Sequence, residues 1–79
     1  MTLREDQRLF FIEEVAAENY GRGMSFSSAL KDAANLSDEL LFGRMEHVLR
    51  RRERGLGPGE DHRQSEFKTK LLLLYSEDL

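Results

Sequence analysis

A chain of 79 residues has room for one domain with a small core, because a chain this short buries only about 60–65% of the surface that its unfolded form exposes. Hydrophobic residues make up 39% of the chain and charged residues 34%, so it is polar for a globular protein but too apolar to be disordered. The net charge is −3, and the absence of cysteine excludes disulfides, thiolate metal ligands and cysteine nucleophiles.

The amino terminus carries charge from Arg4 onward, and the acidic pair Glu13-Glu14 follows, so we expect no signal peptide. The longest apolar run is Leu71 to Tyr75, whereas a membrane-spanning helix needs roughly 20 apolar residues. Together with the absence of cysteine, these features predict a soluble, cytoplasmic protein that has no membrane partner.

The first predicted element is a helix over residues 3–20. Thr2-x-x-Glu5 has the form of a capping box, and apolar residues then recur at spacings of three and four. These residues are Leu9, Phe11, Ile12, Val15, Ala16 and Tyr20. Gly21 and Gly23 mark the end of the helix, because glycine most easily adopts the left-handed conformation that closes one.

Two further helices follow, each with a serine at its start. Ser25 or Ser27 caps a short Ala-rich helix over residues 26–34, and Ser37 caps a helix over residues 38–54. Leu41, Met45 and Val48 form the apolar stripe of the second of these, flanked by Phe42 and Leu49. Gly43 costs that helix about 1 kcal/mol relative to alanine, so we expect close packing of another backbone against it.

The segment 55–60 is a loop, because it holds three glycines and the only proline of the chain. After it, Asp61-x-x-Gln64 can cap a helix over residues 62–76. Within 66–76, residues Phe67 to Tyr75 also alternate as a strand would, and such a strand could pair across a swapped dimer. Good helix formers and the lack of a second strand favour the helix.

The fold prediction is therefore an all-α domain spanning residues 1–79, a compact bundle of three to four short helices. We expect the first helix, the third helix and the C-terminal segment to form the core. The second helix would be a short cross-piece.

Motifs for catalysis and cofactors fail at defined positions. Gly21-Arg22-Gly23 lacks the third glycine of a dinucleotide fingerprint, since Phe26 stands there, and Gly23 to Ser27 does not form the Gly-x-Ser-x-Gly elbow. His47 and His62 lack a glutamate three residues earlier, so no di-metal pattern is present. Glu14 and Glu18 share one helix face, which we interpret as solvated. We expect no enzyme, no cofactor and no metal site.

A cluster of arginines stands at the end of the third predicted helix: Arg50, Arg51, Arg52 and Arg54. Cations at a helix C-terminus stabilise the helix dipole, so the cluster has a structural explanation. It also predicts a patch that binds an acidic protein or nucleic acid. The four residues span most of one helical turn, so at most two or three can face one partner.

One segment, Leu30-Lys31-Asp32-Ala33-Ala34-Asn35-Leu36-Ser37 followed by Leu41, resembles the helix–turn–helix of bacterial transcription regulators. The resemblance implies DNA binding by residues 26–54, with the helix that starts at Asp38 in the major groove. Asn35 stands where that family usually has glycine, Lys31 where it has a small residue, and Arg44 where it has an apolar one. The amino-terminal residues of that helix, which would face base edges, are Asp38 and Glu39, and their charges would repel phosphates.

Apolar residues exceed what one stripe per helix can bury. Phe10 lies beside Phe11, Leu40 beside Leu41, and four leucines occupy positions 71–74. The surplus predicts an apolar surface that contacts another chain, unless the last helix is central in the core.

We therefore expect a non-catalytic regulatory, adaptor or inhibitor protein that binds a larger protein, with a homodimer as a further candidate and nucleic acid as the alternative partner. Short chains without motifs or cysteine are typical of phage or mobile-element inhibitors. The candidate binding residues are Phe10, Arg50, Arg51, Arg52, Arg54, Leu72 and Tyr75.

Overall fold

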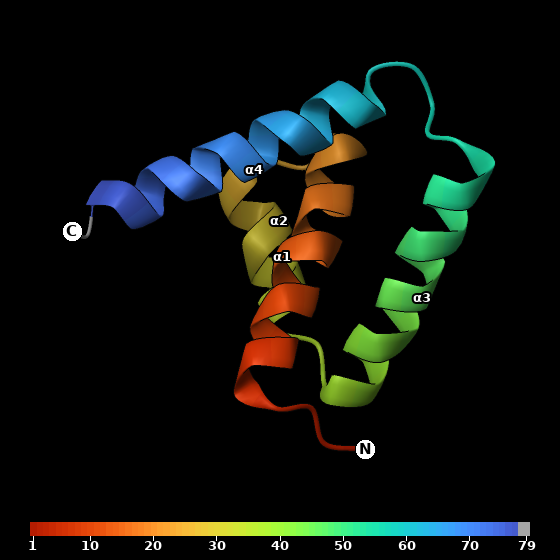
Figure 1. Ribbon diagram of the computed structural model, residues 1–79, viewed down its shortest axis with the longest axis vertical. Helices are drawn as coiled ribbons and strands as arrows, with labels where there is room; N and C mark the ends of the chain where they lie inside the picture. The colour runs from red at the N-terminus through yellow and green to blue at the C-terminus, as the bar shows by residue number, and fades with distance from the viewer. Residues whose placement is uncertain (78–79) are drawn as a thin grey trace.

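The computed structural model describes residues 1–77, and this part of the chain is all-α (Figure 1). Its four helices are α1 (Glu5–Gly21), α2 (Phe26–Ala34), α3 (Asp38–Arg54) and α4 (Glu60–Glu77). The predicted all-α fold is confirmed. The segment 66–76 is helical, so the strand alternative is wrong for the residues that are described.

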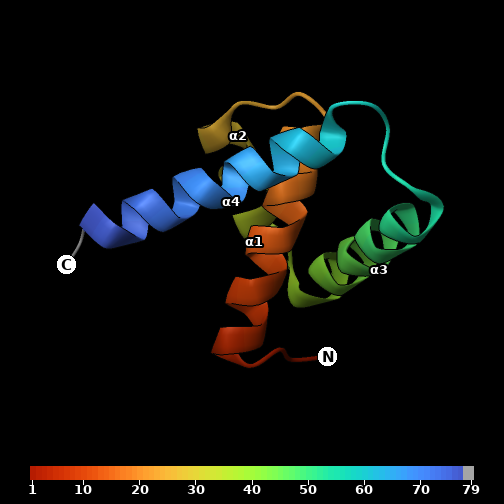
Figure 2. The same ribbon diagram turned by 45° about the horizontal axis from the view of Figure 1, so that its top comes forward.

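Helix α1 is the centre of the molecule. The other three helices each pack against it, whereas they make few contacts with one another. Figure 2 shows α2 behind α1, α4 crossing its C-terminal end and α3 standing to one side. The molecule is consequently flat, with dimensions of 37 × 34 × 18 Å.

The core follows from small residues on α1 and α2. Ala16 and Ala17 on α1 and Ala29 and Ala33 on α2 are fully buried, and their short side chains let the two helices approach closely. Because α2 supplies fully buried residues, it is a core element, and the expectation of a mere cross-piece is wrong.

Phe67 anchors α4 in this core. It is fully buried, and its ring centroid lies 4.9 Å from that of Phe26 and 5.6 Å from that of Tyr20. These tilted aromatic pairs add to the free energy gained by burial. From α3, the stripe of Leu41, Met45 and Val48 is buried as predicted.

The helix starts confirm the predicted serine caps and correct two others. Ser25 and Ser37 accept hydrogen bonds from the backbone N–H groups of Ser28 and Leu40. Thr2 does not cap α1, because the helix starts at Glu5, and the Gln7 side chain accepts a hydrogen bond from the N–H of Arg4 instead. Helix α4 starts at Glu60, before the predicted Asp61 cap.

Gly43 does not mark a close approach of another backbone. A Cβ atom built on it would meet nothing within 4 Å, and the residue is exposed on the outer side of α3. The predicted packing reason for this glycine is therefore wrong. Gly23 and Gly55, by contrast, have φ angles of 114° and 94°, in the region that glycine adopts most easily.

Candidate functional site

The structure divides the arginine cluster into an inner and an outer pair. Arg51 and Arg52 turn toward α1 and α4, where they bond with carboxylates. Arg50 is 68% exposed and forms only an ion pair of 3.7 Å with Glu46 on its own helix, and Arg54 is exposed as well. Only Arg50 and Arg54 therefore present their charge to solvent.

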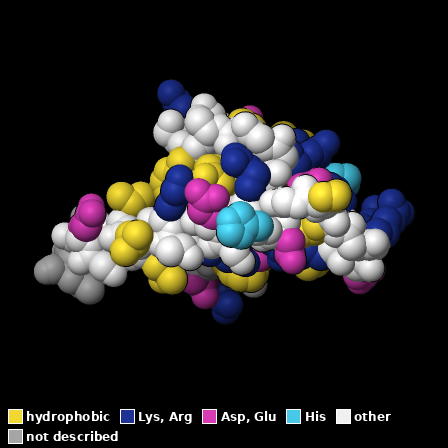
Figure 3. Space-filling view, turned by 90° about the horizontal axis from the view of Figure 1, so that it is seen from above, with side chains coloured by type: hydrophobic (Ala, Val, Ile, Leu, Met, Phe, Trp, Pro, Cys, Tyr) yellow, Lys and Arg dark blue, Asp and Glu magenta, His cyan; other side chains and the backbone are white. Residues whose placement is uncertain are grey.

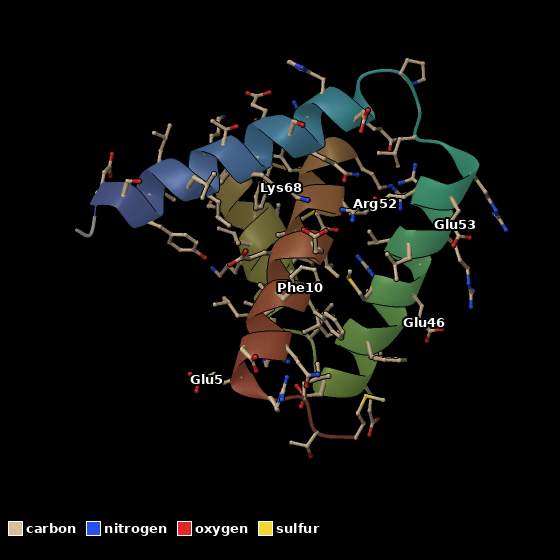
Figure 4. All side chains as sticks on the ribbon, viewed as in Figure 1. Glu5, Phe10, Glu46, Arg52, Glu53 and Lys68 are labelled. Carbon is tan, nitrogen blue, oxygen red and sulfur yellow. The ribbon has the colours of Figure 1, made fainter. Side chains whose placement is uncertain are left out.

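Two buried glutamates of α1 receive the inner arginines. Glu14 is 8% exposed and Glu18 3%. Arg52 Nη1 lies 2.7 Å from Glu14 Oε1, Lys68 Nζ lies 3.0 Å from Glu14 Oε2, and Figure 4 shows both cations reaching the same part of α1. The sequence-based interpretation of a solvated Glu14 and Glu18 face is wrong.

Glu18 and Arg51 complete this network. Arg51 donates to Glu18, and its Nη2 atom lies 2.7 Å from Glu60 Oε2 at the start of α4. Gln64 Nε2 donates to Glu18 Oε2 at 3.1 Å. The network thus fastens the last turns of α3 and the first turns of α4 to α1, whereas α3 and α4 make few contacts with each other.

Electrostatic interactions keep Glu14, one of the two buried glutamates of this network, charged. Burial raises the pKa of Glu14, but hydrogen bonds from Arg52 and Lys68 outweigh it and hold the pKa below its ordinary value of 4.5. Hydrogen bonds to Glu18 and Glu60 raise the pKa of Arg51. All buried side-chain nitrogen and oxygen atoms of the described residues have a hydrogen-bond partner, so the network is satisfied as it stands.

A largely apolar groove of about 340 Å³ lies between α1 and α3. Phe10 and Phe11 line it from α1, and Phe42, Met45 and Leu49 line it from α3. Glu14, Glu46 and Arg52 lie at its edges. We call this the α1/α3 groove.

Several of its apolar side chains are open to solvent. Phe10 is 52% exposed, Leu49 49% and Phe42 37%. Figure 4 places Phe10 on the side of α1 that faces the viewer, below the ends of Arg52 and Lys68. The groove therefore offers aromatic and aliphatic surface beside a charged cluster that is already paired.

A second hollow, of about 240 Å³, lies between α1 and the C-terminal half of α4. Leu71, Leu72 and Tyr75 line it, and the Tyr75 hydroxyl donates to Glu13 Oε1 at 2.8 Å. Beyond it α4 extends past the bundle, and Leu72, Leu73 and Leu74 are exposed there. Figure 3 shows hydrophobic side chains near this end of α4.

The candidate residues therefore fall into three places. Phe10 and Arg52 line the α1/α3 groove, Leu72 and Tyr75 lie at the α1/α4 hollow, and the other three arginines lie at the C-terminal end of α3 outside the groove lining. Phe42, Met45 and Leu49 were not singled out as binding residues, because their spacing on α3 also fits a buried stripe. Only the lateral position of α3 leaves Phe42 and Leu49 exposed.

The segment that resembles a helix–turn–helix does form two helices joined by residues 35–37. Its second helix starts with acidic residues, and the carboxylate of Asp38 is already bonded to other groups of the protein. Its Oδ2 atom accepts from the Leu3 N–H at 2.8 Å, and its Oδ1 atom lies 2.8 Å from Arg8 Nη1. Arg44 bonds to Asn19 Oδ1 at 3.3 Å, so it serves as a polar contact to α1.

Within residues 1–77, no group of three or more His, Cys, Asp or Glu side chains could hold a metal ion. None of the described helices combines the length and the apolar character needed to cross a bilayer. Comparison with protein-family models, with curated proteins and with solved structures finds no match for this chain.

Proposed function

We propose that this protein is a non-catalytic binding module, a small regulatory, adaptor or inhibitor protein that binds a larger protein through the α1/α3 groove. The observation that carries the proposal is the continuous apolar lining of the groove, where Phe10, Phe42 and Leu49 are 37–52% exposed. Exposed aromatic and aliphatic side chains around a concave surface are typical of protein interfaces.

The arginines have different roles in this proposal. Arg51 and Arg52 hold α3 in place and so maintain the groove, while Arg50 and Arg54 are exposed and can meet acidic groups of the larger partner outside the groove. The hollow that Leu72 and Tyr75 line extends the apolar surface along α4.

The test compares two substitutions on the same helix. Leu49→Glu places a charge in the groove, whereas Leu40→Glu places it at a site that is 61% exposed and does not line the groove. Affinity capture from lysate, with and without nuclease, supplies the binding partner for the comparison. We expect that this partner binds the wild-type protein and the Leu40→Glu variant, and that Leu49→Glu weakens its binding at least about tenfold.

Three results would contradict the proposal. Equal loss of binding in both variants would place the interface elsewhere. Recovery of nucleic acid alone, together with salt-dependent binding of duplex DNA, would favour the helix–turn–helix alternative. A dimer in sedimentation equilibrium that Leu49→Glu dissociates would show that the groove is occupied by a second copy.

A further inference from the structure

Carboxylates of α3 and α1 follow the apolar lining of the α1/α3 groove in two rows, of which Glu46 itself lines the groove. On α3, Glu39, Glu46 and Glu53 follow one another at seven-residue spacing, which places them on one face of the helix, beside Phe42 and Leu49. On α1, Asp6 and Glu13 have the same spacing and stand before and after Phe10 in the sequence, and Glu13 also lines the α1/α4 hollow, where it accepts a hydrogen bond from Tyr75. The apolar strip thus runs between two rows of carboxylates.

The cations near these two rows do not neutralise the carboxylates strongly. Arg52 and Lys68 are both held by the buried Glu14. The pairs Arg50–Glu46 at 3.7 Å and Arg4–Asp6 at 3.5 Å join side chains that are at least half exposed, and exposed pairs of this kind contribute little free energy. The amino group of Met1 lies 3.7 Å from Glu39 in a similar exposed pair. A partner's cations can therefore compete for these carboxylates.

The lining of the groove fits a helix. Phe42 and Leu49 occupy positions i and i+7 of α3, so they offer exposed apolar contacts along about two helical turns, and the buried Met45 at i+3 forms the floor between them. An amphipathic helix presents its own anchors with the same periodicity and lies along such a groove. The acidic rows on either side then meet the polar flanks of that helix.

We infer that the occupant of the α1/α3 groove is an amphipathic helix of another protein, with Lys or Arg along the flanks of its apolar face. This inference rests on the proposed function and specifies the chemistry of the partner. The same acidic rows disfavour nucleic acid and anionic membranes at this face, because both present phosphates.

Two synthetic helical peptides of about 18 residues test the inference. They share the same leucines at positions i, i+3, i+4 and i+7, and their flanking positions are all Lys in one peptide and all Glu in the other. Fluorescence anisotropy measures their binding to the full chain. In about 0.1 M salt we expect the Lys-flanked peptide to bind at least about tenfold more tightly, and in about 1 M salt we expect the difference to shrink.

Charge reversal on the protein provides the second arm. The double variant Glu46→Lys, Glu53→Lys is expected to abolish or invert the preference for the Lys-flanked peptide. The control is Glu5→Lys, Glu77→Lys, which changes the net charge equally but alters exposed residues that do not line the groove. The control should keep the preference, and thermal unfolding checks that both variants are folded.

The outcomes separate this inference from the proposed function. If the two peptides bind equally, or if the control variant loses the preference as well, the basic amphipathic helix is the wrong occupant. The protein-binding proposal survives that result as long as the captured partner still depends on Leu49. If Leu49→Glu affects neither the peptides nor the captured partner, both proposals are wrong.

Discussion

Arg50 and Arg51 are adjacent in sequence and alike in chemistry, but their surroundings differ. Arg50 is 68% exposed, whereas Arg51 bonds to Glu18, whose side chain is 4% exposed, and to Glu60. The position of the partner carboxylate therefore decides what each arginine contributes. A buried carboxylate that loses its cation is costly, while an exposed one is solvated by water.

This contrast gives a direct comparison of stability. Arg51→Ala leaves Glu18 buried without its cation, so we expect the free energy of unfolding to fall by about 2 kcal/mol. Arg50→Ala should change it by less than about 0.5 kcal/mol. Urea denaturation of both variants measures the difference. Equal effects would mean that Arg51 acts only as a cation at the end of α3.

At the element scale, α3 combines a buried stripe, an exposed apolar edge and an outer face without close neighbours. Its Gly43 lies on that outer face, where a methyl group would meet nothing within 4 Å. Glycine in the interior of a helix lowers stability because the unfolded chain gains conformational freedom. The packing at this position therefore gives no reason for a glycine.

Gly43→Ala should consequently stabilise the protein by about 1 kcal/mol, which corresponds to a rise in melting temperature of roughly 4–8 °C for a domain of this size. Gly55→Ala serves as the control, because Gly55 has a φ of 94° and alanine would be strained there. Thermal unfolding followed by circular dichroism compares the two. An unchanged or lower melting temperature for Gly43→Ala would show that the outer face of α3 is covered.

In the whole molecule, three helices depend on α1 for their placement, and charged links support α3 at both of its ends. Glu14 connects α1 to Arg52 of α3 and Lys68 of α4. Asp38 connects the start of α3 to Arg8 and to the backbone of Leu3. Both links require ionised carboxylates, so the arrangement of the helices depends on pH.

Acid should therefore weaken the fold in a defined range. The backbone N–H of Leu3 and then Arg8 hold the pKa of Asp38 below its ordinary value of 3.8, and the pKa of Glu14 lies below 4.5. A lowered pKa in the folded state stabilises the protein above the ordinary value, and this stabilisation is lost as the pH falls through the folded-state value. We expect a steady free energy of unfolding from neutral pH to about pH 5, and a decline below about pH 4.5.

Urea denaturation between pH 7 and pH 3 measures this dependence. Glu14→Gln is the matched variant, because it removes the titrating group and keeps a side chain of similar size. At pH 7 the free energy of unfolding of Glu14→Gln should be lower than that of the wild-type protein, and it should fall less steeply as the pH decreases. If the free energy of unfolding of the two proteins changed identically with pH, Glu14 would not contribute to the acid sensitivity of the fold.

Much of the fold could be predicted from local signals in the sequence. Ser37, the stripe from Leu41 to Val48 and the glycines after Arg54 gave the bounds of α3, because caps and periodicity act within a few residues. The predicted start of α1 was wrong. Nothing local in the sequence distinguishes a cap by Thr2 from the hydrogen bond that the Arg4 N–H donates to the Gln7 side chain.

The candidate site was less predictable, because it depends on how the helices are placed. Glu14 and Glu18 look like surface residues until Arg51, Arg52 and Gln64, which lie 33 to 46 residues away in the sequence, reach them from α3 and α4. Phe10 could be identified from the apolar surplus. Phe42 and Leu49 could not be separated from core residues, because their exposure results from the lateral position of α3.

The separation between the Ala-rich core and the lining of the groove affects how this chain can diverge. Ala16, Ala17, Ala29 and Ala33 are fully buried, so substitutions there disturb the fold. Phe10, Phe42 and Leu49 are partly in water, and exchanging them costs less stability. Descendants of such a sequence can alter the shape and chemistry of the groove, and with it the partner they select, while they inherit an unchanged scaffold.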